Sequence, residues 1–327
     1  MIHLSVEIRR YPLREPFVIA RGAQTETQTL LVTLVDQAGR RGRGEGCGVE
    51  YAGETLETMS AQIEAAREVI EAGVSRQALL ELLPAGGARC AIDAALWDLQ
   101  AKQSGRSAFE LAGATPVRPV TTAYTIGIRH AADYEIAARL RANYKLLKIK
   151  VDAREPLAAV ESARRGAPDA RFIVDPNQAW SVDMLKALAS PMADLGVVLI
   201  EQPIRVGDEP GLDGYRCPIQ LCADELVNDS RDLEKAKGRF DVINIKLDKS
   251  GGLTSALALA GEARAEGFDL MVGCMVGSSL GMAPAMVLAQ QCAFADLDGP
   301  LLQATDWPDG LSYREGVIDP PSRAFWG

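Results

Sequence analysis

A charged residue ends each of several successive apolar segments in the middle of the chain, and the spacing between these residues is nearly constant. Lys150, Asp175, Glu201, Asp224 and Lys246 follow one another at intervals of 25, 26, 23 and 22 residues. One β-strand, one α-helix and two turns fill such an interval, so the spacing predicts a parallel β/α barrel. The carboxyl ends of barrel strands meet at one rim, where residues far apart in sequence converge. We therefore expect these side chains to form a single site.

The whole barrel can be placed along the sequence from this spacing. Its strands are expected near residues 120–126, 146–151, 171–175, 197–201, 219–223, 241–246, 270–274 and 292–296. Helices are expected at 156–165, 182–195 and 253–266, whereas 207–218 contains too many turn-forming residues for a full helix. The predicted fold class is α/β, a modified TIM barrel of the (β/α)7β type that occupies residues 116–299.

The 327 residues exceed the roughly 250 that such a barrel needs, which leaves room for a second domain. Residues 1–115 are expected to form an α+β capping domain, with strands at 2–10 and 28–36 and helices at 55–72 and 89–101. The glycine-rich residues 42–48 indicate a flexible strand end. Residues 300–327 are expected to return to the capping domain.

Composition excludes several classes of partner and environment. A net charge of −9 argues against a nucleic-acid surface. The six cysteines form no Cys-x-x-Cys pair, and the N-terminus lacks an apolar signal core, so we expect a reduced, cytoplasmic protein. Residues 270–295 carry no charge over 26 positions, but internal glycine, serine and proline favour a strand, a turn and a helix over a membrane span.

Three carboxylates at consecutive strand ends indicate a metal site. Asp175, Glu201 and Asp224 each follow an apolar run, at the position where side chains reach the mouth of a barrel. Oxygen ligands without histidine suit Mg²⁺. The alternative for any one of them is a solvated strand end or an ion pair, but three in succession favour the metal.

Lysines provide the second signal. Lys148 and Lys150 are two residues apart on one strand and so face the same side, while Lys246 ends a strand four steps further around the barrel. A substrate carbon between Lys150 and Lys246 would have a base on each face. Nearby cations and partial burial can lower a lysine pKa toward neutrality. The alternative is a set of surface lysines with buried stems.

These motifs resemble those of the enolase superfamily, muconate-lactonizing subgroup, and within it the dipeptide epimerases that act on L-Ala-D/L-Glu. The resemblance covers the whole chain. The sequences that carry it are Lys-x-Lys at 148–150, Asp-Pro-Asn-Gln at 175–178, Glu-Gln-Pro at 201–203, Asp-Glu at 224–225, Asn-Ile-Lys-Leu-Asp-Lys-Ser-Gly-Gly-Leu at 244–253, Phe-Val-Ile-Ala-Arg-Gly at 17–22, Gly-Cys-Met at 273–275 and Phe-Ala-Asp-Leu-Asp-Gly-Pro at 294–300.

The resemblance implies a 1,1-proton transfer at the C-terminal residue of a dipeptide, in the recycling of murein peptides. One Mg²⁺ per subunit would stabilise an enediolate, and Lys150 and Lys246 would act as bases on opposite faces. Lys148 would contribute its charge. The two histidines, His3 in the first strand and His130 at a helix start on the far side, leave no histidine base.

Substrate contacts are also implied by the resemblance. Asp296 and Asp298 would bind the α-ammonium group of the dipeptide, and Arg21, in a specificity loop at 17–27, would pair with the glutamate side chain. Thr125, Cys274 and Met275 would line the pocket. Pro176 replaces the more common alanine, which should alter backbone stiffness more than metal binding.

Three alternatives stay open at the level of sequence. An o-succinylbenzoate synthase or a muconate cycloisomerase would use the same metal and lysines. A Schiff-base lyase would use Lys150 or Lys246 as a nucleophile, and a barrel without chemistry would need neither. Metal dependence separates these alternatives. The sequence leaves open whether the protein is a homo-oligomer.

Overall fold

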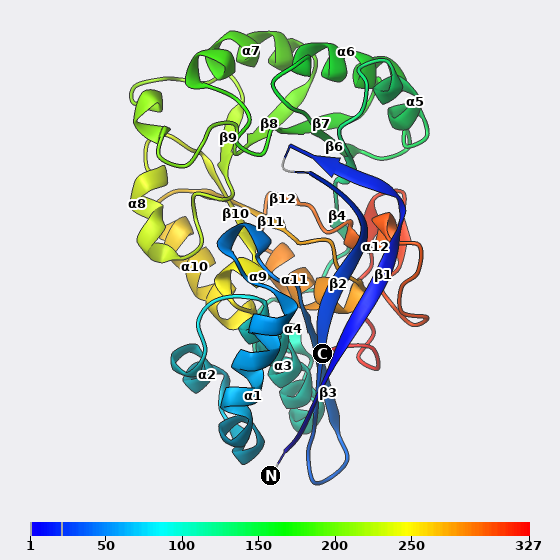
Figure 1. The fold of residues 1–327 in the computed structure, drawn as a ribbon, viewed down its shortest axis with the longest axis vertical. Coiled ribbons are helices and arrows are strands. Elements are labelled where there is room, and N and C mark those ends of the chain that lie inside the picture. Colours follow the sequence, from blue (N-terminus) through cyan, green and yellow to red (C-terminus); the bar gives the residue numbers. More distant parts are fainter. Residues whose placement is uncertain (1, 21) are drawn as a thin grey trace.

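The structure is a computed structural model, and it describes residues 2–20 and 22–327. Its N-terminal part is a three-stranded antiparallel sheet, in the order β1-β2-β3, with helices packed against it (Figure 1). The elements are β1 (His3–Ile19), β2 (Gly22–Val35), β3 (Arg41–Gly46), η1 (Glu50–Ala52), α1 (Leu56–Gly73), α2 (Arg76–Leu82), α3 (Gly87–Ser104) and α4 (Ala108–Leu111). β1 and β2 are longer than expected because their hairpin continues to the barrel, where Val18 O accepts a hydrogen bond from Ile128 N.

Three glycines of β3 allow this strand to pack directly against α3. A Cβ atom on Gly42, Gly44 or Gly46 would lie 2.1 Å from a backbone oxygen of α3. Those oxygens belong to Ala95, Ala91 and Gly87, which are one helical turn apart on one face of the helix. The interpretation of residues 42–48 as a flexible strand end is therefore wrong, because the glycines permit close packing in a strand.

The second part is an eight-stranded parallel sheet that curls into a barrel, with its helices outside (Figure 1). Its strands are β5 (Tyr124–Ile126), β6 (Leu146–Lys150), β7 (Arg171–Asp175), β8 (Val197–Glu201), β9 (Gln220–Ala223), β10 (Val242–Lys246), β11 (Asp269–Gly273) and β12 (Phe294–Ala295). The connecting helices are α5 (Asp133–Arg139), α6 (Pro156–Gly166), α7 (Val182–Asp194), η2 (Glu209–Leu212), η3 (Ser230–Asp232), α8 (Leu233–Ala236), α9 (Leu247–Ser250), α10 (Leu253–Ala265) and α11 (Ser279–Ala289), and α12 (Gly299–Leu302) follows β12. The predicted α/β barrel behind a capping domain is confirmed, and residues 207–218 contain only the short η2.

Local sequence sets where several helices begin. The Thr55 and Ser181 side chains accept hydrogen bonds from Thr58 N and Met184 N, which caps α1 and α7. Pro156 occupies the first turn of α6, where its missing N–H costs nothing.

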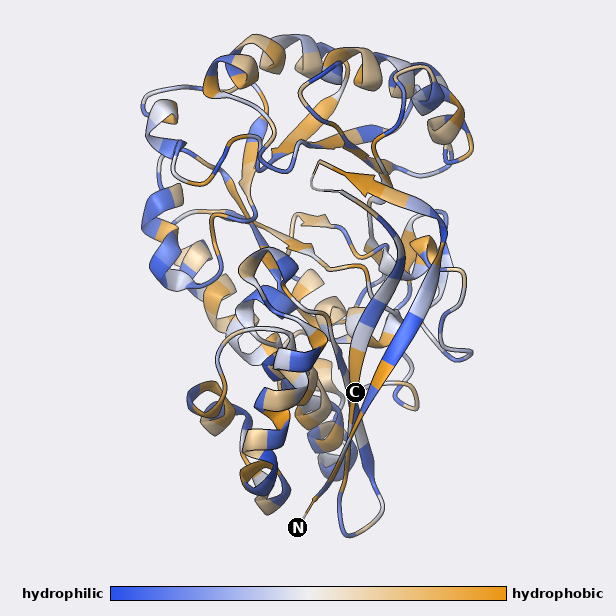
Figure 2. Cartoon of the chain, in the orientation of Figure 1, coloured by the Kyte–Doolittle hydropathy of each residue, from blue (hydrophilic) through white to orange (hydrophobic). Residues whose placement is uncertain are grey.

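An apolar layer fills the lower interior of the barrel. It is built from buried residues at the same depth on neighbouring strands: Ala123, Leu146, Ile173, Leu199, Cys222, Val242, Met271 and Phe294. Figure 2 colours most of the barrel strands orange, as expected for strands covered on both faces. The next interior positions, two residues further along each strand, are therefore the first that are free to carry polar groups.

The expected strand at 120–126 is divided in the structure. β4 (Val120–Thr121) pairs with β14 (Val317–Ile318), which also pairs with β13 (Tyr313–Arg314), and only β5 joins the barrel. Between β4 and β5, Ala123 N donates a 2.8 Å hydrogen bond to Ala295 O, which connects the first and last barrel strands. The partners of β4 are nearly 200 residues away, so the local pattern could not separate the two strands.

The last residues of the chain contact the capping domain. Phe325 and Trp326 are buried, and Trp326 Nε1 donates to Arg43 O at 3.1 Å and to Ala94 O at 3.2 Å. Gly327 N donates to Asp98 Oδ1 at 2.8 Å. The domain limits at 115 and 299 stay predictions.

No helix among residues 2–20 and 22–327 is long and apolar enough to cross a membrane. The uncharged residues 270–295 fall in β11, α11 and β12, so the interpretation as a strand, a turn and a helix is confirmed.

Candidate active site at the barrel rim

The polar residues predicted from the sequence lie next to the apolar layer, at the carboxyl ends of the barrel strands. β6 carries Lys148 and Lys150 on its interior face, two and four residues after Leu146. The ends of the following strands add Asp175, Glu201, Asp224, Lys246 and, after β12, Asp296. Lys148 is 1% exposed, Lys150 7% and Lys246 8%, so each ammonium group must be paired to remain charged.

Lys148 lies among three carboxylates. Its Nζ is 3.0 Å from Asp175 Oδ2, 2.7 Å from Glu201 Oε2 and 2.8 Å from Asp296 Oδ2. Burial lowers the pKa of Lys148, but Asp296, Glu201 and Asp175 outweigh this and hold the pKa well above its usual value. With these three partners, Lys148 therefore carries a positive charge.

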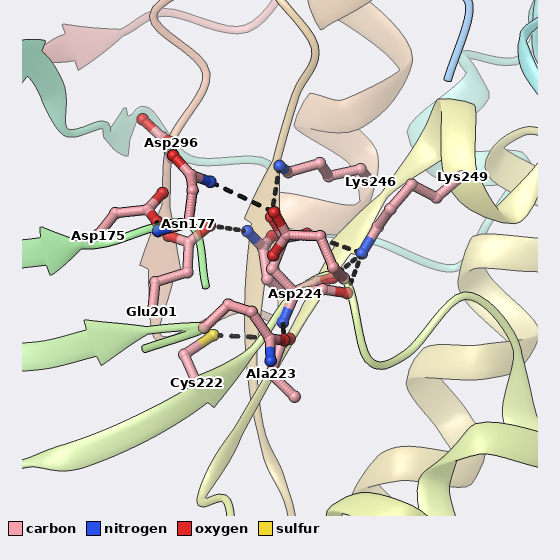
Figure 3. A network of polar contacts seen from close by, with 12 residues as sticks. Asp175, Asn177, Glu201, Cys222, Ala223, Asp224, Lys246, Lys249 and Asp296 are labelled. Carbon is pink, nitrogen blue, oxygen red and sulfur yellow. Dashed lines mark hydrogen bonds and ion pairs between the residues drawn. The ribbon is translucent and has the colours of Figure 1, made fainter. Parts of the chain in front are cut away.

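Lys150 and Lys246 lie on β6 and β10, which are four strands apart in the sheet. Lys150 Nζ is 2.6 Å from Asp175 Oδ2 and donates to Asn177 Oδ1 at 2.9 Å. Lys246 Nζ is 2.7 Å from Asp224 Oδ2 (Figure 3). In an eight-stranded barrel four strands is half the circumference, so the two amines approach the mouth from opposite sides.

The carboxylates respond differently to these partners. Burial raises the pKa of Asp175, but Lys150 and Lys148 lower it to about 2. Burial raises the pKa of Asp224 as well, but Lys246 and Lys249 outweigh burial and keep this pKa well below its usual value. For Glu201 the effect of burial is larger than that of Lys148, and the pKa of Glu201 is raised to about 7. Burial lowers the Lys246 pKa, whereas Asp224 raises it above the usual value.

The three predicted metal ligands offer oxygen atoms only, which fits a hard cation such as Mg²⁺. Glu201 Oε2 is buried and makes no hydrogen bond, and the Lys148 ammonium group is its ionic neighbour. Within the described part of the chain, no three acidic, histidine or cysteine side chains are arranged so that they could hold a metal ion. Each of the three carboxylates is instead paired with a lysine, so coordination requires their side chains to rotate toward a common point. The metal site stays a prediction.

Asp296 and Asp298 lie on the opposite side of the mouth from β8. Thr125 N donates to Asp298 Oδ2 at 2.6 Å, and Thr125 Oγ1 donates to Asp296 Oδ1 at 3.3 Å. Burial, together with Asp296, raises the pKa of Asp298 to about 7. A bound ammonium group would relieve the repulsion between the two carboxylates. Cys274 and Met275 follow β11 and are half-buried next to this pair along the rim.

Arg21 lies outside the described residues. Within the specificity loop expected at 17–27, residues 17–19 end β1 and residues 22–27 begin β2, so these parts of it form paired strands, and its role in specificity stays a prediction. Gln24 Nε2 donates to Glu50 Oε2 at 3.4 Å, which joins this hairpin to η1. His130 also differs from expectation: it lies after β5 on the same rim as the site, in a separate cavity of about 370 Å³ with Val18, Tyr134 and Arg154.

Three further residues of the site were not among the predicted functional residues. Asn177 accepts from Lys150, and Asn244 Nδ2 donates to Glu201 Oε1 at 2.9 Å. Lys249 Nζ contacts Asp224 Oδ1 at 2.7 Å from a side other than that of Lys246 (Figure 3). Side chains two residues apart on a strand face the same side, so Asn244, two positions before Lys246, could have been predicted to face the barrel interior.

Two family models together match almost the whole chain. One, described as mandelate racemase / muconate lactonizing enzyme, N-terminal domain, matches residues 1–113, and the other, described as enolase C-terminal domain-like, matches residues 132–324.

Individual relatives are similar over most of their length. An L-Ala-D/L-Glu epimerase from Escherichia coli is 41% identical over 94% of this chain and 96% of its own, and an N-acetyl-D-glutamate racemase from Pseudoalteromonas is 43% identical over 76% and 79%. A crystal structure from Agrobacterium tumefaciens, an enolase family member with bound sodium and L-Ala-L-Glu, matches 100% of both chains at 41% identity and a TM-score of 0.97. A dipeptide epimerase from Enterococcus faecalis, solved with Mg and L-Leu-L-Tyr, matches 97% of this chain and 96% of its own at 28% identity and a TM-score of 0.89.

Proposed function

Because the chain belongs to the mandelate racemase and muconate lactonizing enzyme family of the enolase superfamily, we propose that it is an isomerase that epimerises the C-terminal residue of L-Ala-D-Glu and L-Ala-L-Glu. The observation that carries this proposal is the position of Lys150 and Lys246 at the ends of strands four apart, with carboxylates between them. A two-base inversion needs one amine on each face of the substrate carbon.

Lys150 and Lys246 would each remove the α-proton of one stereoisomer, and the lysine on the opposite face, as an ammonium group, would deliver a proton to the enediolate to give the other stereoisomer. In the structure Asp224 raises the pKa of Lys246, so Lys246 must lose this counterion before its neutral amine can form. A cation held by Asp224 would take this counterion away from Lys246. Lys148 stays charged next to the developing negative charge.

We assign the cofactor as one Mg²⁺ per subunit, held by Asp175, Glu201 and Asp224. A divalent cation bound there would stabilise the negative charge that develops on the substrate carboxylate. Support comes from the all-oxygen donor set of the three carboxylates, together with the Mg in the Enterococcus faecalis structure.

Deuterium exchange tests the reaction. In D₂O with Mg²⁺, L-Ala-L-Glu should lose the NMR signal of the glutamate α-proton and yield L-Ala-D-Glu, while the alanine α-proton serves as an unchanged internal reference. Absence of exchange with every dipeptide tried would refute the proposal. Chelation should abolish exchange, whereas a Schiff-base lyase would stay active and would trap a substrate adduct on borohydride reduction.

N-Acetylglutamate is the second candidate substrate, because one relative is an N-acetyl-D-glutamate racemase. It carries an acyl group in the same place as the dipeptide but has no ammonium group. The paired carboxylates Asp296 and Asp298 favour the dipeptide, so N-acetyl-L-glutamate should exchange at least about tenfold more slowly than L-Ala-L-Glu. The reverse order would make N-acylglutamates the preferred substrates.

We also propose that Arg21 binds the glutamate side chain. Arg21→Met should reduce exchange of L-Ala-L-Glu by roughly 10- to 100-fold, the range expected for a lost hydrogen bond between charged groups. L-Ala-L-Gln has the same shape without the charge and should be affected much less. An equal loss for both substrates would show that Arg21 does not recognise the carboxylate.

The remaining parts of the proposal concern the cell. We place the enzyme in the cytoplasm, in the recycling of murein peptides. All six cysteines are free thiols, in keeping with a reducing compartment.

A further inference from the structure

We infer that Gln202 is a positioning residue that fixes the backbone of Asp224 for cation binding. The inference rests on the proposed function, because that proposal assigns Asp224 to the metal. Gln202 directly follows Glu201 and is completely buried. It therefore lies between two of the proposed ligands without presenting its own side chain to the substrate.

The side chain of Gln202 reaches from the end of β8 to the turn after β9. Its Oε1 accepts hydrogen bonds from Asp224 N at 2.9 Å and from Leu226 N at 3.1 Å, and its Nε2 donates to Ile204 O at 3.0 Å. These two amides flank the bend at which the chain leaves β9. One acceptor atom thus sets the direction in which the Asp224 side chain leaves the backbone.

The backbone of Gln202, at the end of β8, forms hydrogen bonds with the ends of both neighbouring strands, β7 and β9. Its N–H donates to Cys222 O and its carbonyl accepts from Gln178 N, both at 2.8 Å. Asn177, Gln178 and Gln202 have φ values of +46°, +70° and +33°, which are unusual for residues other than glycine. Such conformations persist only where the surroundings enforce them, and they concentrate at functional sites. The exits of β7, β8 and β9 are therefore one connected unit.

Glutamine meets requirements that its close analogues do not. Glutamate keeps the acceptor for the two amides but loses the donor to Ile204 O and adds a buried charge. Methionine keeps the length and loses all three side-chain hydrogen bonds, which leaves two buried amides without a partner.

Gln178 provides a matched control. It is also a glutamine with positive φ on the same rim, but its side-chain Oε1 accepts from Val206 N at 3.0 Å, in the exposed turn that follows β8. Gln178→Met therefore removes one side-chain hydrogen bond at this rim and leaves the hydrogen bonds from Asp224 N and Leu226 N to Gln202 in place.

The test is Mg²⁺ titration by calorimetry in the absence of substrate. Gln202→Met should weaken Mg²⁺ binding by roughly 10- to 100-fold, the range found when partners that orient a metal ligand are lost. Gln202→Glu should lose less, and Gln178→Met should stay within about twofold of the wild type. Binding by Gln202→Met at the wild-type level would overturn the inference while leaving the proposed function intact. Wild-type protein that binds no Mg²⁺ would overturn both.

Hydrogen exchange of the wild type gives a second readout that does not depend on a folded variant. The amides of Asp224 and Leu226 should exchange only when the barrel unfolds, because both donate to a buried acceptor. Exchange at the rate of open turns would refute the role of Gln202.

Discussion

Asp93 shows how the environment of one residue sets a pH dependence of stability. It is completely buried between α3 and α10, where its carboxylate accepts hydrogen bonds from the backbone and side chain of Thr254. Burial raises its pKa to about 6, and the Thr254 hydrogen bonds and Arg76 only partly offset this. An acid with a raised pKa stabilises the fold below its unfolded pKa near 4, and this contribution is lost as the pH rises through 6.

We therefore expect Asp93 to lower the free energy of unfolding by up to roughly 3 kcal/mol between pH 4 and pH 7.5. Asp93→Asn keeps the shape and removes the titration, so its unfolding free energy should fall less over this range. Urea unfolding of both proteins at several pH values measures the difference. Parallel pH profiles would contradict the role given to Asp93.

At the same scale, the sequence predicted which residues meet but not how they pair. The two-residue alternation of strands suffices to place Lys148 and Lys150 on one face. It carries no information on the ion pairs of Lys148 with Asp175, Glu201 and Asp296, because those depend on the curvature of the barrel. Arg21 was predicted as a substrate contact and stays a prediction.

At the scale of elements, the packing of β3 on α3 gives a second prediction. Gly44→Ala would place a methyl group 2.1 Å from Ala91 O, so the strand and the helix must separate. We expect a loss of at least about 1 to 3 kcal/mol in the free energy of unfolding, the range of overpacked cores. Denaturant titration provides the measurement.

Gly261→Ala is the matched control. Gly261 is exposed in α10, and a Cβ atom there would meet nothing within 4 Å. This change should raise stability by about 0.5 to 1 kcal/mol, because alanine favours a helix. Similar stabilities for the two variants would show that β3 does not need glycine.

The elements that differ from expectation are those that depend on contacts with distant parts of the sequence. Regular spacing predicted the barrel strands and most helices, since each follows from local apolar patterns. The same reasoning took the glycines of 42–48 for flexibility and merged β4 with β5. Both errors concern contacts with elements distant in sequence, α3 in the first case and β14 in the second.

At the scale of the whole molecule, Trp326 connects the end of the chain to the capping domain. Trp326→Ala should reduce stability by about 3 to 5 kcal/mol, as for other large buried aromatic residues. Trp326→Phe keeps most of the ring and removes the hydrogen bonds to Arg43 O and Ala94 O, so it should cost less. Equal and small effects of both changes, measured by thermal unfolding, would mean that this contact does not hold the parts together.

The position of the two lysines on opposite sides of the barrel predicts the stereochemistry of the reaction. Lys150 and Lys246 approach from opposite sides, so each should serve one stereoisomer of the substrate. Lys150→Gln and Lys246→Gln should each exchange the glutamate α-proton of only one of L-Ala-L-Glu and L-Ala-D-Glu in D₂O, and the two variants should differ in which one. Loss of exchange from both stereoisomers to the same extent in each variant would contradict the two-base mechanism.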